Sequence, residues 1–156
     1  MKKYMGFTLI EMMVVVMIMG ILIAIAVPRY KLYIIRGNRS AMQADMMQIA
    51  ANMERYKAMQ LTYTNAALTG ANNVYGSATF PLGASGTKVL YNLTLGSDTG
   101  STPTATYWLL TATPNSGGTQ KGDGAMMLDS QGRRCWNPSS DTTCTITDTT
   151  QGWNNQ

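Results

Sequence analysis

The strongest constraint in this sequence is an apolar stretch near its start. From Phe7 to Val27, Glu11 is the one charged residue. At a helical rise of about 1.5 Å per residue, this stretch spans about 30 Å, the thickness of the hydrocarbon core of a bilayer. A carboxylate in such a stretch is costly unless it is paired. The stretch therefore predicts a membrane-spanning helix, and Glu11 is a candidate functional residue.

Two ordinary targeting segments compete with this interpretation. A secretory signal peptide has a shorter apolar run than this one. An uncleaved signal anchor would let Glu11 snorkel to the interface from one turn inside. Neither alternative explains why Glu11 lies five residues after Gly6, so a more specific class of protein is favoured.

The residues around the stretch resemble the N-terminal segment of type IV pilins and the related pseudopilins. The shared pattern is a basic leader, MKKYMG, then residues 7–11 (FTLIE), and an apolar helix ending near Pro28. The resemblance implies that a prepilin peptidase cuts between Gly6 and Phe7 on the cytoplasmic face and N-methylates Phe7. It also implies that Glu11 guides assembly of the subunits into a helical filament.

Location and partners follow from the same resemblance. Before assembly the chain would lie in the inner membrane with a cytoplasmic N-terminus and a periplasmic head, and afterwards in an extracellular pilus. Its partners would be other pilin subunits, the prepilin peptidase and the pilus assembly platform. Flanking charge does not set this orientation, because basic residues lie on both sides of the apolar stretch. They are Lys2 and Lys3 on one side and Arg29, Lys31, Arg36 and Arg39 on the other.

Four segments are expected along the chain: a cleaved leader (1–6), a transmembrane and filament-core helix (7–28), an amphipathic stem helix (29–60) and a head (61–156). Helical spacing of four and three residues places one set of large side chains on a single face of the stem. The set is Met42, Met46, Ile49, Met53 and Tyr56, and Arg39 is predicted to lie off this face. The helix is expected to end near residue 59.

The head has the pattern of a β-rich domain. Strands are predicted at 88–95, 104–113, 125–129 and 133–136, and the last two form a hairpin through residues 130–132. Residues 61–87 are expected to form an irregular connection, because Gly and Pro interrupt any period. The fold class is therefore α+β: a long N-terminal helix packed on a roughly four-stranded antiparallel sheet.

Cys135 and Cys144 are the two cysteines of the chain. In an exported protein an even count favours a bridge, and two cysteines allow one pairing within the chain. We therefore expect a disulfide-closed C-terminal loop. The pair disfavours a type II secretion pseudopilin.

Catalytic chemistry finds no support in the sequence. The chain has no histidine, no glycine-rich phosphate loop and no carboxylate pair at helical spacing in the head, so neither an enzyme nor a cofactor is predicted. Four aspartates could supply oxygen ligands to calcium, but they lack the spacing of a calcium-binding loop. They are Asp123, Asp129, Asp141 and Asp148, and they are interpreted instead as solvated turn residues with no metal.

A DNA contact is the second functional hypothesis. Arg133 and Arg134 could contact phosphates while Trp136 stacks on a base, with Lys88 and Lys121 nearby. Residues 61–156 carry a net charge of −1, however, and phosphate binding usually needs a basic field. A solvated edge strand with protective arginines is the favoured interpretation of this segment.

The sequence thus predicts a structural pilus subunit, and a minor pilin rather than the major one. The order TYWLLTATP, polar loop, MMLD and Cys-Trp in the head also resembles minor pilins of type IVa systems. Such a subunit would support pilus assembly, adhesion, twitching motility or DNA uptake. The alternatives are a DNA-binding receptor for natural transformation on the same scaffold, or a type II secretion pseudopilin.

Overall fold

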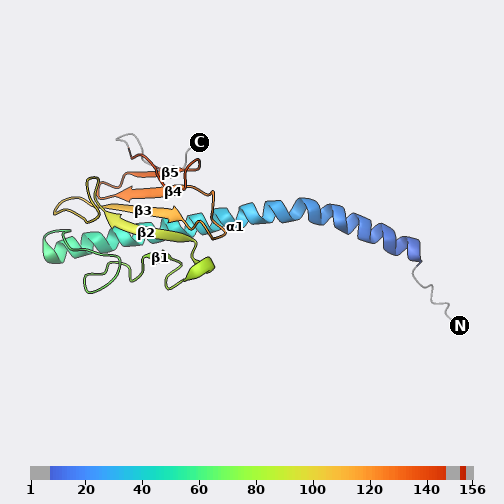
Figure 1. Ribbon diagram of the computed structural model, residues 1–156, viewed down its shortest axis with the longest axis horizontal. Helices are drawn as coiled ribbons and strands as arrows, with labels where there is room; N and C mark the ends of the chain where they lie inside the picture. Colours follow the sequence, from blue (N-terminus) through green and yellow to red (C-terminus); the bar gives the residue numbers. More distant parts are fainter. Residues whose placement is uncertain (1–7, 147–151, 154–156) are drawn as a thin grey trace. The chain divides into compact units, whose positions relative to one another are not determined.

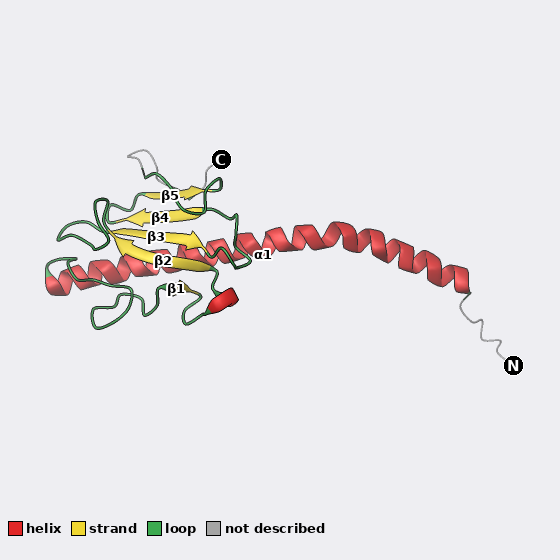
Figure 2. Cartoon of the chain, in the orientation of Figure 1, coloured by secondary structure: helices red, strands yellow, loops and turns green. Residues whose placement is uncertain are grey.

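The computed structural model describes residues 8–146 and 152–153. One long helix, α1 (Leu9–Gln60), precedes a short strand and a 3-10 helix, and then four further strands (Figures 1 and 2). The elements after α1 are β1 (Thr79–Phe80), η1 (Gly86–Lys88), β2 (Tyr91–Gly96), β3 (Leu109–Pro114), β4 (Ala125–Asp129) and β5 (Arg134–Asn137). The predicted α+β class is confirmed. The chain divides into two compact units, residues 1–36 and 37–156.

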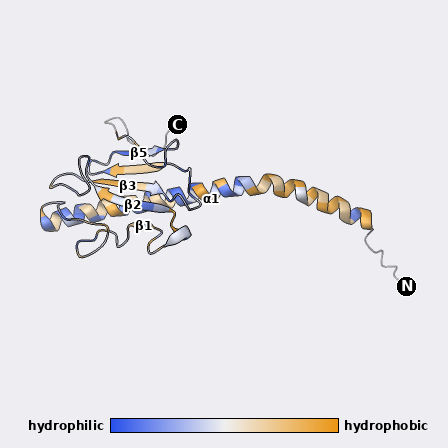
Figure 3. Cartoon of the chain, viewed as in Figure 1, coloured by the Kyte–Doolittle hydropathy of each residue, from blue (hydrophilic) through white to orange (hydrophobic). Residues whose placement is uncertain are grey.

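The described part of the first unit belongs to α1. Its large apolar side chains are exposed from Leu9 to Val27, and α1 is long and apolar enough to cross a membrane. Figure 3 shows this apolar character over the N-terminal part of the helix. As predicted, α1 continues through Pro28, although proline has no N–H to donate to the carbonyl of Ala24.

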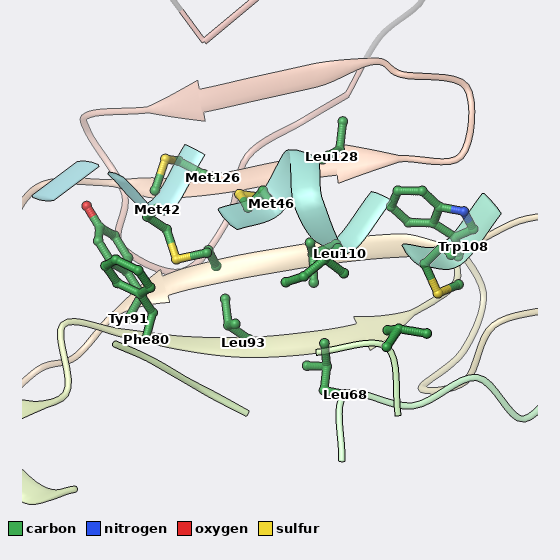
Figure 4. Close-up of a cluster of buried hydrophobic side chains, with 14 of the residues drawn as sticks. Met42, Met46, Leu68, Phe80, Tyr91, Leu93, Trp108, Leu110, Met126 and Leu128 are labelled. Carbon is green, nitrogen blue, oxygen red and sulfur yellow. The ribbon is translucent and has the colours of Figure 1, made fainter. Parts of the chain in front are cut away.

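In the second unit α1 buries one face against the sheet. Four side chains at the predicted spacing are fully buried: Met42, Met46, Ile49 and Met53. Tyr56, the last member of the predicted set, is half-buried and packs against the same core. Figure 4 shows Met42 and Met46 lying over the strands that carry Leu110 and Met126. The helical spacing therefore identified the face that the core covers.

The sheet has five antiparallel strands in the order β1-β2-β3-β4-β5. Side chains alternate across it, so Tyr91 and Leu93 of β2 are buried while Asn92 and Thr94 are exposed. Tyr91 pairs with Pro114, and Leu93 pairs with Ala112. The core thus lies between one face of the sheet and the buried face of α1.

The sheet differs from the expectation at its first edge. β1 lies inside the connection that was predicted to be irregular, and it pairs Phe80 with Tyr91. Phe80 is 9% exposed, and its ring lies 6.3 Å from that of Tyr91. So short a strand cannot show an alternating pattern, which is why the sequence did not reveal it.

Two strand starts also shift. β2 begins at Tyr91 instead of residue 88, because Gly86–Lys88 form a 3-10 turn. β3 begins at Leu109 instead of residue 104. The Thr104 backbone N–H donates to the carbonyl of Tyr107 at 2.9 Å, and this turn precedes the strand.

The hairpin of β4 and β5 confirms the prediction for residues 125–136. Its turn is held by Asp129, whose carboxylate accepts the backbone N–H of Gln131 at 3.0 Å and that of Arg133 at 2.9 Å. Gly132 has a positive φ, a left-handed conformation that favours glycine. Cys135 of β5 and Cys144 form the predicted disulfide, with a sequence separation of 9.

Candidate assembly helix and nucleic-acid surface

The start of α1 is capped by Thr8, a residue type that is preferred at this position. Its hydroxyl oxygen accepts the backbone N–H of Glu11, and its carbonyl accepts that of Met12. Glu11 therefore lies in the first turn, where a negative charge interacts favourably with the helix dipole. Its side chain is exposed, so it is accessible to a neighbouring chain. The predicted cleavage residues Gly6 and Phe7 lie outside the described residues.

A partly buried polar cluster joins α1 to the sheet, and we call it the Arg39 cluster. Its members are Asn38, Arg39, Tyr91, Gln120, Asp123 and Trp136. Arg39 forms an ion pair with Asp123, and its Nε lies 3.0 Å from each carboxylate oxygen. The guanidinium also lies over the Trp136 ring, 3.8 Å from the centroid. Arg39 was predicted to lie off the core face, and this was wrong, because Arg39 is one helical turn before Met42 and faces the sheet.

The Asp123 carboxylate accepts hydrogen bonds from more than one side chain. It is 4% exposed, and besides Arg39 it accepts a hydrogen bond from the hydroxyl of Tyr91. Gln120 donates to the Tyr91 oxygen at 2.8 Å and accepts from Asn38 at 3.0 Å. Burial raises the pKa of Tyr91, and the neighbouring Asp123 carboxylate raises it further. The phenol therefore stays protonated at neutral pH and acts as a donor.

A second ion pair lies at the other end of the sheet. Arg133 Nε and a terminal nitrogen each lie 2.7 Å from a carboxylate oxygen of Asp129, which is 1% exposed. Burial raises the pKa of the Tyr107 phenol, and the neighbouring Asp129 carboxylate raises it further. The charge of Arg133 is thus compensated within the hairpin.

The three residues predicted to contact DNA have different environments. Arg133 is paired with Asp129, as above. The Trp136 ring lies under Arg39, and its indole N–H donates to the carbonyl of Asp123 at 2.7 Å. Arg134 is half-buried and lies 5.2 Å from the ring centroid of Trp153. Of the two arginines, Arg134 forms no ion pair with any residue that the structure describes.

Lys88 and Lys121 do not lie beside Arg133, contrary to the expectation. Lys88 ends η1 just before β2, and Lys121 lies in the loop between β3 and β4. That loop is tied to the η1 segment, because the Asn115 side chain donates to the carbonyls of Gly86 at 3.1 Å and Val89 at 3.0 Å. The strand register places the β4–β5 turn at the opposite end of the sheet. Both lysines are exposed, and they lie at the end of the sheet away from the β4–β5 turn.

The aspartates that the structure describes do not converge on a metal site. Among the described residues, no group of three or more His, Cys, Asp or Glu side chains could hold an ion. Asp123 and Asp129 are buried in ion pairs, so their interpretation as solvated turn residues was wrong. Asp141 accepts the backbone N–H groups of Gly122 at 2.7 Å and Gly124 at 2.9 Å. Asp148 lies outside the described residues.

The disulfide leads to a direct prediction. Thiol labelling of native protein without reductant should modify neither Cys135 nor Cys144. Replacing both by serine should lower the free energy of unfolding by about 2–3 kcal/mol, because the unfolded chain then gains the freedom of the opened loop. Mass spectrometry of the labelled protein and denaturant unfolding of the variant check the two parts. Full labelling of both thiols in native protein would contradict the closed loop.

These features together define a class of protein. An exposed apolar helix with a carboxylate in its first turn, an amphipathic continuation packed on an antiparallel sheet, and a C-terminal disulfide are the parts of a type IV pilin. Residues 1–27 match the family model of the prokaryotic N-terminal methylation motif. Residues 28–132 match the model of the type IV minor pilin ComP, DNA uptake sequence receptor. This match covers more than half of the chain, so the chain belongs to the ComP family of type IV minor pilins.

Curated relatives agree with the pilin class over a shorter segment. Three sequences from Dichelobacter nodosus, each named type IV major fimbrial protein FimA, are 49% identical to this chain over 49 residues. The matched segment covers 31% of this chain and 31% of each relative, so it spans about a third of their length. The ComP match ends at residue 132, before Arg133, Trp136 and the disulfide loop.

Proposed function

We propose that this chain is a minor pilin that enters a type IV pilus through α1 and binds duplex DNA for uptake. The observation that carries the proposal is the match to the ComP model over residues 28–132, which include the sheet-packed half of α1 and β1 to β4. The family is described as a DNA uptake sequence receptor. The DNA-binding function, which the sequence placed second to a purely structural role, is therefore the better supported of the two.

Processing and assembly form the first half of the proposal. The methylation motif over residues 1–27 supports cleavage between Gly6 and Phe7 and methylation of Phe7 by a prepilin peptidase. The inner membrane would hold the apolar part of α1, with the head in the periplasm, until the pilus assembly platform adds the subunit to the filament. Glu11 would then act as the assembly carboxylate.

The position of the DNA contact is the second half. Residues 37–156 contain equal numbers of basic and acidic residues, so a DNA surface must be local. Arg39 and Arg133 are held by buried aspartates, and Trp136 is held by Arg39. Lys88 and Lys121 are exposed on adjoining segments. We therefore place the phosphate contact at Lys88 and Lys121. Arg134, at the turn end of the β4–β5 hairpin, is a separate candidate from the original set.

A salt titration tests this surface. The full chain in neutral detergent should bind duplex DNA with an affinity that falls as salt rises, because phosphate binding releases counterions. Replacing Lys88 and Lys121 by glutamine should reduce the slope of log affinity against log salt by about 1.8, or about 0.9 for each lost phosphate contact. Fluorescence anisotropy of labelled duplexes measures both slopes.

The controls distinguish a wrongly placed DNA surface from the absence of DNA binding. The K88R/K121R variant keeps both charges and should keep the wild-type slope. If K88Q/K121Q has the wild-type slope, the DNA surface lies elsewhere, and R134Q is the next variant to measure. If the wild-type chain binds neither host nor unrelated duplexes, the chain is a structural subunit and the DNA half of the proposal is wrong.

A further inference from the structure

A group of basic and aromatic residues follows the apolar stretch directly, and we call it the collar. Its members are Arg29, Tyr30, Lys31, Tyr33 and Arg36, all within the first unit. All five are exposed, with Tyr30 at 66% and Tyr33 at 77%. Neither pilus assembly through Glu11 nor DNA binding by the head uses these side chains.

The helix arranges the collar around its circumference. At about 3.6 residues per turn, Arg29, Tyr33 and Arg36 follow i, i+4 and i+7 spacing and share one face. Lys31 lies on the opposite side of the helix, and Tyr30 lies between the two. The axial distance from Arg29 to Arg36 is about 10 Å. The collar is therefore a narrow basic and aromatic band rather than a long stripe.

The length of the apolar segment places this band at a membrane surface. From Leu9 to Val27 the helix rises about 27 Å, close to the thickness of a hydrocarbon core. If that segment fills the core, Arg29 is the first charged residue to reach the headgroups. Tyrosine is enriched at this depth, because its ring is apolar and its hydroxyl is polar.

The collar charges have no acidic partner among the described residues. The two ion pairs recorded there are those of Arg39 and Arg133 in the second unit. The one acidic residue of the described first unit is Glu11, which lies at the other end of the apolar segment from Arg29. The basic groups are thus available to an external anion.

We propose that the collar binds the headgroups of anionic phospholipids and holds the subunit in the membrane before assembly. Arginine forms paired hydrogen bonds with phosphate oxygens, and each basic residue near an anionic surface adds to the attraction. The collar is basic although it lies on the flank where the positive-inside rule expects no excess of Lys and Arg. Headgroup binding gives this excess a function that is independent of DNA uptake.

DNA offers the same phosphate chemistry, but the observations favour lipid. The collar adjoins an exposed apolar segment of bilayer length, so its guanidinium groups lie in the headgroup layer whenever that segment is inserted. The Lys88 and Lys121 surface belongs to the second unit and has no such apolar neighbour on the chain. Entry into a filament would then require the collar to release its lipids.

Spin-labelled lipids test the proposal. The full chain is reconstituted in phosphatidylcholine vesicles that contain a trace of spin-labelled phosphatidylglycerol or spin-labelled phosphatidylcholine. Electron spin resonance then gives the fraction of each probe that the protein immobilises. The wild-type chain should select phosphatidylglycerol by about fivefold at low salt, and the preference should fall towards one at high salt as the charges are screened.

Two matched variants decide the origin of the preference. R29Q/R36Q removes two charges from one face of the collar and should bring the selectivity close to one. K88Q/K121Q removes two charges from the head and should keep the wild-type selectivity. Equal selectivity in R29Q/R36Q and wild type would overturn the proposal, as would a wild-type chain without preference. Loss of duplex binding by R29Q/R36Q with unchanged lipid selectivity would also overturn it and assign the collar to DNA.

Discussion

Replacing Arg39 by methionine should lower the free energy of unfolding of the head by about 3–5 kcal/mol. This is the typical cost of removing one partner from a buried ion pair, because the other charge stays buried without compensation. Here the remaining charge is Asp123, which is 4% exposed. Methionine keeps much of the arginine side-chain volume, so the loss is mainly electrostatic. Denaturant unfolding followed by tryptophan fluorescence measures it, since Arg39 lies over Trp136.

A matched control is available on the same helix. Arg55 is an exposed arginine of α1 in the second unit, and R55M should change stability by no more than about 0.5 kcal/mol. In the double variant R39M/D123N both charges are gone, and much of the stability should return. If R39M is as stable as R55M, the ion pair makes no net contribution and the helix is held by its apolar face alone.

The residues that the sequence predicted best are those governed by a simple period. The spacing of Met42, Met46 and Ile49 follows the helix, and the alternation of Tyr91 and Leu93 follows the strand. Burial follows these periods directly, so the core residues could be predicted without knowing the tertiary contacts of the chain. The hairpin was also predictable, because turn residues lie between two short strands.

The polar contacts were harder to predict, because they join residues that are far apart in sequence. Arg39 and Asp123 are 84 residues apart, and nothing local marks either as a member of a pair. One signal was present: Arg39 precedes Met42 by about one helical turn, so it shares the buried face of the helix. A charged residue on such a face indicates a buried partner. Asp123 and Asp129 were interpreted as solvated turn residues, because the sequence alone does not show which arginine each of them pairs with.

The proposed DNA surface illustrates the same limit. Arg133, Arg134 and Trp136 are close together in sequence, which made them the obvious basic and aromatic group. In the structure Arg133 pairs with the buried Asp129, and Trp136 donates to the carbonyl of the buried Asp123. Lys88 and Lys121 are far apart in sequence, and the Asn115 side chain of the β3–β4 loop joins their two segments. Exposed lysines on neighbouring loops cannot be found from spacing.

The other large effect is expected at Glu11. Under the proposed assembly, cleavage before Phe7 creates a new amino terminus four residues before Glu11. In a filament core of packed helices both charges lose water, and each is costly alone. Pairing Glu11 with the amino terminus of a neighbouring subunit would satisfy both charges and set the axial stagger between subunits. The exposed position of Glu11 in the first turn of α1 is consistent with such a contact.

Replacing Glu11 by alanine should therefore leave cleavage and membrane insertion intact, and it should reduce incorporation into pili by about two orders of magnitude or more. That factor corresponds to the cost of about 3–5 kcal/mol for one unpaired buried charge. Immunoblots of membranes and of sheared pili measure insertion and incorporation separately, and mass spectrometry of the mature N-terminus measures cleavage.

Two further variants separate the charge of Glu11 from its shape. M13A truncates an apolar side chain in the same part of α1, so it should incorporate nearly as well as wild type. E11Q keeps the shape of the glutamate side chain and loses its charge, so it should fail as E11A does. If E11A enters pili as efficiently as M13A, Glu11 is only an interfacial carboxylate and the filament is held by apolar contacts alone.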